Sequence, residues 1–409
     1  MKVLHTSDWH LGRTLYGRKR TSEYARFLSW LADTIVEQDI DLLCIAGDVF
    51  DTTTPSNRSQ NLYYNFLQKI VAAGCREVVI IAGNHDSPTL LEAPGKILKS
   101  LHVHVVGRID SNPGKEIIVI KNADKSPGLM VCAVPYLRDR DIRTATAGES
   151  IDDKGRNLVK GVEHHYHQVV KLAEQQRESM GITVPIIAMG HLFAAGGKTV
   201  EGDGVRDLYV GTLAHIPAHI FSDSIDYLAL GHLHSSQIIG GMPTRRYSGS
   251  PLPMSFAEAN KEKEVLIISI SDTVEEIRPL TVPSFQNLVS LRGDLPSMLE
   301  KIHSLKAEQF AGWLEIICEC RENPATLQES LQKAVEGTSL EIIRIVNTPI
   351  VSASLMQGAF TQSLEELTVD DVFDECLKHH GIDDTEKEAL TMRFRKACIF
   401  LQEYDSNAD

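Results

Sequence analysis

The sequence lacks long apolar runs and any excess of positive charge. In 409 residues no hydrophobic stretch approaches the ~18 consecutive apolar residues that a membrane-spanning helix needs. A secretory signal pattern is also missing, because Met1 and Lys2 lead directly into a short apolar segment. We therefore expect a cytoplasmic protein with no membrane association. Its hydrophobic content of 43% is enough for a large core, divided among two or three domains.

Cysteine is also scarce. The seven cysteines are scattered and odd in number, which indicates a reducing compartment rather than a disulfide framework. Cys44 and Cys132 lie within apolar segments and are expected to be small buried hydrophobic residues. Cys318 and Cys320 are too close together for common zinc spacings, so we interpret them as part of a strand.

The net charge of −14 disfavours nucleic-acid binding by the surface as a whole. Much of it comes from residues 361–409, which hold thirteen acidic and five basic residues. One basic cluster is either a solvated face or a contact for phosphate, and its position close to a polar motif near the N-terminus makes it a candidate DNA contact. The cluster consists of Arg13, Arg18, Lys19 and Arg20.

Five apolar segments each end in side chains that commonly bind metal ions. We interpret these segments as buried strands. Apolar residues at helical spacing over 24–35, and a second helix from Pro55 to about Gly74, separate the first three of these strands. This alternation predicts an α/β sheet, in which ligands collect beyond the carboxyl ends of the strands. The strand-end residues are Asp8 and His10, then Asp48, then Asn84, His85 and Asp86, then His191, and finally His232 and His234.

Seven of these residues form a candidate metal set of four imidazoles, two carboxylates and one amide, without thiolate. This mixture favours manganese, iron or catalytic zinc over magnesium alone. Seven ligands are too many for one ion with an open position, whereas two ions about 3.5 to 4 Å apart can share a carboxylate, most naturally that of Asp48. The set comprises Asp8, His10, Asp48, Asn84, His191, His232 and His234.

Two divalent cations in such a site would activate water and neutralise a phosphoryl group during in-line attack. The leaving oxygen then needs a proton. His85 lies between the ligand Asn84 and the acidic Asp86. We predict that His85 is the general acid and that Asp86 holds its ring in the required tautomer.

After Asp272 the pattern changes to strand, helix, strand, helix, strand over 285–347, without a motif of its own. A less patterned stretch then leads to two short amphipathic helices, for which binding to a partner is favoured over folding back on the body. We expect a first domain at 1–275, a second at 280–348, a linker at 349–364 and a helical partner-binding region at 365–409.

The strand-end residues together resemble the complete motif set of the calcineurin-like metallophosphoesterase superfamily. The motifs read here as Asp8-X-His10, Gly47-Asp48-X-X-Asp51, Gly83-Asn84-His85-Asp86, Gly190-His191 and Gly231-His232-X-His234. A narrower resemblance is to the SbcD family, the nuclease subunits of bacterial SbcC–SbcD DNA repair complexes. It rests on four longer segments, at 5–12, 135–142, 205–212 and 247–256.

This resemblance implies a metallophosphoesterase β-sandwich flanked by helices, followed by a small α/β capping domain and a helical C-terminal tail. It implies two manganese ions, with magnesium, iron or zinc as alternatives. One ion would be held by Asp8, His10, Asp48 and His234, and the other by Asp48, Asn84, His191 and His232.

The implied activity is DNA cleavage, as a single-strand endonuclease and as an ATP-dependent 3′-to-5′ exonuclease on duplex ends. The roles implied are end processing, hairpin cleavage, replication, recombination and repair. The nucleotide would be bound by an SbcC-type coiled-coil ATPase and not by this chain. The resemblance also implies a homodimer, formed through the helix after Pro55 and the one around 88–100, within a heterotetramer. The capping domain would shape DNA access and the tail would hold the coiled coil.

Asp51 departs from archaeal and eukaryotic relatives, which carry a histidine at this position, and leaves open how the substrate phosphate is oriented. Two alternatives also stay open. A phosphatase or small-molecule phosphodiesterase could use the same metals but would need a closed pocket. A non-catalytic scaffold of this fold would normally have lost ligands, whereas all seven are present.

Overall fold

The structure is a computed structural model that describes residues 1–142, 150–194, 216–319 and 324–347, together with 373, 377, 387 and 390–394. The chain divides into two compact units, Met1–Pro349 and Ile350–Asp409. The predicted linker, most of the predicted tail helices and the segment 205–212 lie outside the described residues. Within the second unit the rings of Phe373 and Phe394 stack with centroids 3.9 Å apart. No described helix is long and apolar enough to cross a membrane.

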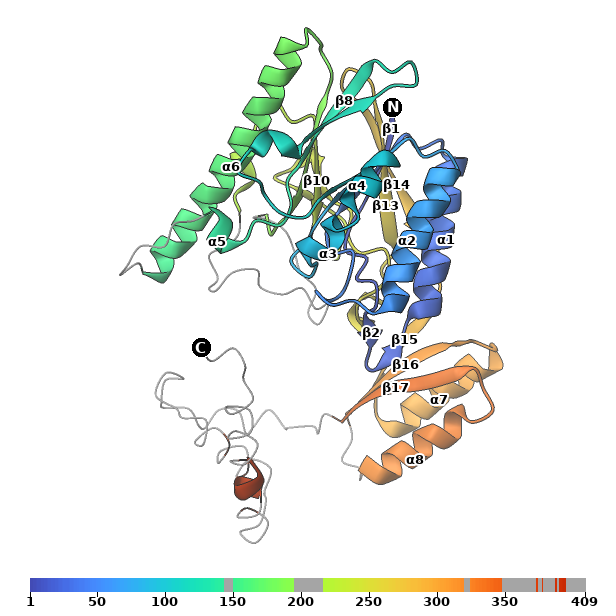
Figure 1. Ribbon diagram of the computed structural model, residues 1–409. Coiled ribbons are helices and arrows are strands. Elements are labelled where there is room, and N and C mark those ends of the chain that lie inside the picture. The colour runs from blue at the N-terminus through green and yellow to red at the C-terminus, as the bar shows by residue number, and fades with distance from the viewer. Residues whose placement is uncertain are drawn as a thin grey trace. The chain divides into compact units, whose positions relative to one another are not determined.

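Two six-stranded sheets form the centre of the first unit within its described residues (Figure 1). The first sheet has the order β14 (Val274–Val282), β13 (Lys263–Ile270), β1 (Lys2–Thr6), β4 (Leu42–Ala46), β5 (Glu77–Ile81) and β6 (Val103–Val106). The second has the order β11 (Gln237–Ile239), β12 (Met242–Tyr247), β10 (Tyr227–Gly231), β9 (Ile186–His191), β8 (Pro127–Ala133) and β7 (Ile117–Lys121).

The two sheets pack face to face. On β4, Cys44 and its alternate neighbours belong to the cluster between the sheets, whereas Leu43 and Ile45 face the helices on the outside. Because successive side chains point to opposite faces of a strand, a continuous apolar run is needed when both faces are covered. Cys132 is likewise buried, on the outer face of the second sheet. The predicted β-sandwich is confirmed, and both cysteines are core residues.

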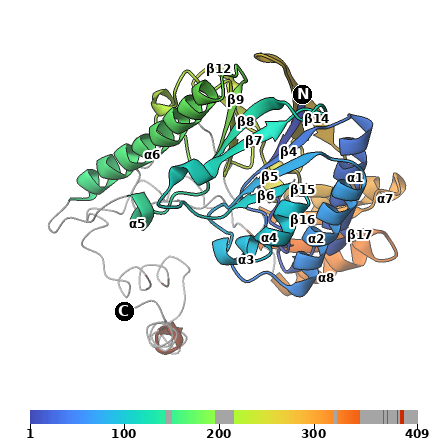
Figure 2. The ribbon, with the colours of Figure 1, turned by 45° about the horizontal axis from the view of Figure 1, so that its top comes forward.

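Helices cover the outer faces of the sandwich (Figures 1 and 2). On the first sheet these are α1 (Thr21–Glu37) and α2 (Asn57–Ala72), followed by the short α3 (Pro88–Glu92) and α4 (Gly95–Ser100). On the second it is the long α6 (Ile151–Ser179), against which the short α5 (Asp139–Ile142) packs. The second helix was predicted to begin at Pro55, but it begins at Asn57 because the Ser56 side chain caps it by accepting from Ser59 N at 3.2 Å.

A third, three-stranded parallel sheet follows β14, which runs past the predicted boundary at residue 275 to Val282. The predicted strand–helix alternation is observed as β15 (Leu288–Gly293), α7 (Leu295–Ala307), β16 (Gly312–Cys318), α8 (Pro324–Val335) and β17 (Leu340–Asn347). A small hairpin consists of β2 (Thr14–Leu15) and β3 (Arg18–Lys19). It contacts this sheet through Tyr16 in its turn, whose hydroxyl accepts a hydrogen bond from Arg344 on β17 at 2.8 Å. Short 3₁₀ turns occur at η1 (Pro113–Glu116), η2 (Ala218–Ile220) and η3 (Phe256–Glu258).

Candidate metal centre

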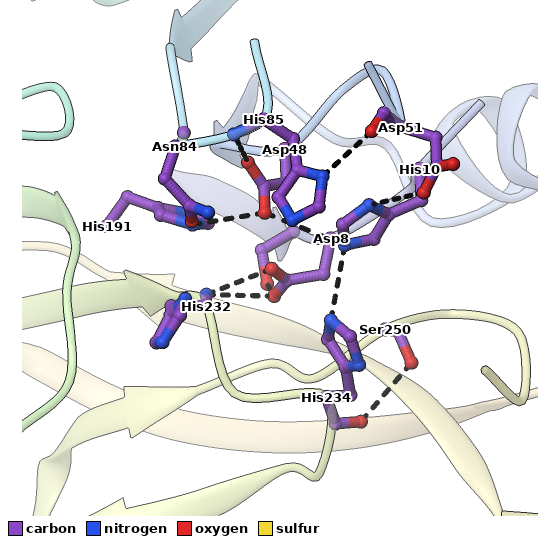
Figure 3. A network of polar contacts seen from close by, with 12 residues as sticks. Asp8, His10, Asp48, Asp51, Asn84, His85, His191, His232, His234 and Ser250 are labelled. Carbon is purple, nitrogen blue, oxygen red and sulfur yellow. Dashed lines mark hydrogen bonds and ion pairs between the residues drawn. The ribbon is translucent and has the colours of Figure 1, made fainter. Parts of the chain in front are cut away.

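The predicted ligands meet where the carboxyl ends of strands from both sheets converge. Strands β1, β4 and β5 are mutually parallel neighbours, and so are β9 and β10, so each group releases its polar residues at one edge. Packing of the two sheets brings these edges together. Figure 3 shows all seven predicted ligands, with His85 and Asp51, in one cluster.

The backbone at this edge is held in an unfavourable conformation. Asp8, His10, Asp48 and His232 have positive φ angles of 54°, 48°, 51° and 107°. Such conformations persist only where the surroundings enforce them, and they concentrate at functional sites. Here Asp8 N donates to Gly47 O and His10 N to Asp48 O, both at 3.0 Å. These hydrogen bonds lock the two ligand loops to each other.

Close packing explains the glycine that follows β5. A Cβ atom added at Gly83 would collide with the carboxylate and the backbone nitrogen of Asp48. Only glycine lets the two strand ends approach this closely.

One ligand group gathers around His10. Its Nε2 lies 3.2 Å from Nε2 of His234 and 3.6 Å from Oδ2 of Asp48. Asp8, His10 and His234 can together present one ligand atom each within 4.8 Å of one another. The Asp8 carboxylate is oriented by Ser7, whose hydroxyl donates to Oδ2 at 2.5 Å, and by the backbone N–H of His232 at 2.9 Å.

A second group gathers around His191. Its Nε2 lies 3.0 Å from Oδ1 of Asn84 and 3.3 Å from Oδ2 of Asp48. Its other nitrogen, Nδ1, contacts the carbonyl oxygen of Ala46 at 2.9 Å, which assigns the proton to Nδ1 and turns Nε2 toward the cluster. The same oxygen of Asp48 therefore lies between the two groups, as a bridging ligand requires.

Burial and charge set the protonation of these ligands. Burial lowers the pKa of His232 to about 3 and also lowers that of His234, so both imidazoles are neutral. Burial raises the pKa of Asp8 to about 6, and the nearby Asp48 carboxylate adds to the effect. Burial opposes protonation of His191, but the Asp48 carboxylate outweighs it and raises the pKa to about 9. Burial likewise opposes ionisation of Asp48, yet His191 holds its pKa below the usual range.

The donor set fits divalent cations. Nε2 of His232 is buried without a hydrogen-bond partner in the described structure, which is costly unless another group engages it. Facing imidazole nitrogens, such as those of His10 and His234, cannot satisfy each other when both lack a proton. A shared cation between such nitrogens and the carboxylates of Asp8 and Asp48 would resolve both problems.

His85 lies beside the ligands, with its ring centroid 4.7 Å from that of His10. Its expected partner was Asp86, and this prediction is wrong in its geometry. The Asp86 carboxylate accepts instead from the backbone N–H groups of Gly83, Val49 and Phe50, at 2.9, 3.1 and 2.9 Å. The contact to Nδ1 of His85 comes from the carbonyl oxygen of Asp51, at 2.8 Å. Asp86 thus holds the loops together rather than the imidazole ring.

Asp51, whose role in orienting the substrate phosphate the sequence left open, lies beside the candidate ligands. Its carboxylate lies 3.3 Å from Nδ1 of His10 and 3.6 Å from the Arg13 guanidinium, while its carbonyl faces His85. Burial opposes ionisation of Asp51, but His10 and Arg13 keep its pKa below the usual value. Its place three residues after Asp48 in a shared motif was the available signal.

The four basic candidates separate in the structure. Arg13 borders the metal centre, with 18% of its side chain exposed. Arg18 pairs with Glu341 on β17, and Lys19 is exposed on β3. Arg20 is buried, donates twice to Glu23 at 2.7 Å and donates once to the Pro253 carbonyl at 2.7 Å. Arg20 is therefore a structural residue, and its prediction as a DNA contact is wrong.

Comparison with known proteins gives matches over most of the chain. The calcineurin-like phosphoesterase family model matches residues 1–236, and the type 5 capsule protein repressor C-terminal domain model matches residues 284–381. A relative from Escherichia coli (strain K12), described as the SbcD subunit of the nuclease SbcCD, is 34% identical over 96% of this chain and 97% of its own. A relative with that description from Bacillus subtilis (strain 168) is 36% identical over 66% of both chains. Another, from Rhodobacter capsulatus, is 34% identical over 66% of this chain and 67% of the relative.

Proposed function

The chain belongs to the SbcD family of calcineurin-like phosphoesterases and is a metal-dependent nuclease subunit, and we propose that it hydrolyses DNA phosphodiester bonds at the metal centre with two cations, manganese being the first choice. The observation that carries this proposal is the position of Oδ2 of Asp48 between His10 Nε2 and His191 Nε2, at 3.6 and 3.3 Å. When bound, two divalent cations supply Lewis acidity that activates water and neutralises charge on the phosphoryl oxygens.

The ligands divide into two sets that share Asp48. Asp8, His10 and His234 would complete one set, and Asn84, His191 and His232 the other. The neutral imidazoles of His232 and His234 are ready ligands, whereas His191 must first lose the proton on Nε2, because only an unprotonated nitrogen can bind a cation.

His85 is the proposed general acid. The Asp51 carbonyl can only accept, so Nδ1 of His85 carries a proton, and Nε2 is the nitrogen that would deliver the second proton to the leaving oxygen. Figure 3 shows the His85 ring beside the ligand side chains. A scissile phosphate bound to the cations would therefore lie next to this ring.

Arg13 is the proposed contact for a substrate phosphate. Its guanidinium lies beside the Asp51 carboxylate, at 3.6 Å, on the partly open side of the centre. A guanidinium binds phosphate oxygens through charge-assisted hydrogen bonds, and here Asp51 would keep it in place between substrates.

Assembly is proposed from the relatives' description as the SbcD subunit of the nuclease SbcCD. The partner would be an SbcC-type coiled-coil ATPase held by the tail, with the third sheet as a capping domain. A homodimer within this heterotetramer would use α2 and the α3–α4 region. There, 68% of Ile97 and 42% of Leu101 are exposed, so both side chains are available for such a contact. The expected compartment is the cytoplasm.

The test incubates the purified full chain with manganese and labelled single-stranded DNA, in parallel with a generic phosphomonoester. We expect DNA cleavage by the chain alone, and duplex cleavage when the partner ATPase and ATP are added. Cleavage of the monoester without cleavage of either DNA would contradict the nuclease proposal and favour a phosphatase. Arg13→Ala should raise KM for DNA and weaken its salt dependence, whereas Lys19→Ala should change both less.

A further inference from the structure

The backbone carbonyl of His234 accepts from a backbone N–H and from a buried lysine. Its oxygen accepts from Ser250 N at 3.1 Å and from Lys263 Nζ at 3.0 Å. These two donors use both lone pairs of the oxygen, because the single hydroxyl proton of Ser250, whose Oγ lies 3.3 Å away, has a nearer acceptor in Leu252 O at 2.9 Å. The contact with Ser250 is visible below the ligand cluster in Figure 3.

Lys263 is buried although it carries a charge. It is 8% exposed, and its ammonium lies 3.0 Å from Oε2 of Glu258, which is completely buried, and 3.0 Å from Ser250 Oγ. Removing such a pair from water costs several kcal/mol, and apolar residues of the same volume would often be at least as stable. The pair is therefore poorly explained by stability alone.

The position of Lys263 in the fold suggests what it does. His234 lies in the irregular segment between β10 and β11 of the second sheet, where no strand pairing fixes its backbone. Lys263 begins β13 of the first sheet, and β13 pairs with β1, the strand that leads to Asp8 and His10. The ammonium group thus ties a ligand of one sheet to the strand pair that carries the ligands of the other.

We infer that Lys263 is a positioning residue that fixes His234 against Asp8 and His10 through the His234 carbonyl, with Glu258 and Ser250 holding the ammonium in place. The inference rests on the proposed function, because it assumes that these three residues bind one cation. Partners in the outer layer of a metal site typically affect affinity by about 10- to 100-fold.

A hollow beside the lysine makes this inference testable by chemical rescue. It has a volume of about 310 Å³ and is lined by Lys263, Ser235, Ser236 and Ser248, among others. A small alkylammonium ion could occupy the space vacated by the lysine side chain in a Lys263→Ala protein. It could not do so in Lys263→Met, which keeps the volume of the side chain and removes only its charge.

The experiment titrates Mn²⁺ into the full chain and counts bound ions by electron paramagnetic resonance. In Lys263→Met and Lys263→Ala we expect one of the two ions to bind about 10- to 100-fold more weakly and the other to be unchanged. Propylamine should restore the affinity in Lys263→Ala and not in Lys263→Met. The matched control is Lys261→Met, which removes an exposed charge beside the same hollow and should behave as wild type.

Wild-type affinity for both ions in the two Lys263 variants would overturn the inference. So would an affinity loss in Lys263→Ala that propylamine leaves unchanged, because the loss would then reflect a general disturbance of the fold. If neither variant folds, Ser250→Ala, which removes the hydroxyl oxygen that accepts from Lys263 Nζ, must weaken the same ion a few-fold, and an unchanged affinity would refute the role. Wild-type chain that binds two ions and cleaves no DNA would contradict the proposed function, while the comparison of affinities would still decide the role of Lys263.

Discussion

The carbonyl oxygen of Asp51 lies 2.8 Å from Nδ1 of His85. A backbone carbonyl cannot change its protonation state, so it holds the imidazole in one tautomer throughout a reaction cycle. The side chain of Asp51 is then available for His10 and Arg13. One residue thereby connects a candidate metal ligand, a candidate phosphate contact and the candidate general acid.

Replacing His85 tests its role in proton transfer. His85→Ala should lower kcat on DNA by about 10²- to 10⁴-fold while two Mn²⁺ ions remain bound, because His85 lies outside both ligand sets. A substrate with a p-nitrophenolate leaving group needs no proton and should lose much less activity. Loss of a bound ion, or equal losses on both substrates, would contradict the assignment.

Replacing Asp48 tests the shared ligand. Asp48→Ala should weaken both ions by more than about 100-fold, since its Oδ2 lies between His10 and His191. Asn84→Ala is the matched comparison and should weaken only one ion, because Asn84 contacts the His191 group alone. Binding of Mn²⁺, counted by electron paramagnetic resonance, distinguishes the two results. Retention of one ion at wild-type affinity in Asp48→Ala would exclude a bridge.

Metal binding should release protons and strengthen with pH. In the cation-free chain the pKa of His191 is raised to about 9 and that of Asp8 to about 6, and binding requires Nε2 of His191 and the Asp8 carboxyl to lose their protons. The affinity for Mn²⁺ should therefore rise as the pH increases from about 6 to 9. Calorimetry at pH 7.5 in buffers of different ionisation enthalpy should find about one proton released per chain. The released proton should be absent in His191→Gln. An affinity that does not depend on pH over this range would refute the coupling.

Arg20 should matter for stability and not for DNA binding. Arg20→Met leaves Glu23 buried without its partner and removes the bond to the Pro253 carbonyl. Breaking a buried pair from one side typically costs about 3–5 kcal/mol. Arg18→Met, which breaks the exposed pair with Glu341, should cost less than about 1 kcal/mol. Urea unfolding measures both values. An Arg20 variant of unchanged stability that binds DNA more weakly would show that Arg20 is a DNA contact after all.

Local sequence predicted the ligands because each motif combines a buried strand with the polar residues that end it. Parallel neighbours then bring the ends together, as they do for β1, β4 and β5. The partners of these ligands were less accessible. Asp86, adjacent to His85 in the sequence, was the expected orienting group, yet its carboxylate satisfies three backbone N–H groups of the Gly83 and Val49–Phe50 loops. Adjacency along a chain does not determine where two side chains point.

By itself the sequence determined the alternation of strands and helices in both parts of the first unit and the set of candidate ligand residues, because apolar periodicity and strand-end chemistry are properties of short segments. The sandwich was expected only from the family resemblance. The tertiary structure alone decided that Arg20 is buried, that Asp51 faces His85 through its carbonyl, and that Lys263 holds His234. Each of these contacts depends on how separate loops, helices and sheets pack together. Packing is set by the whole core, and no short segment encodes it.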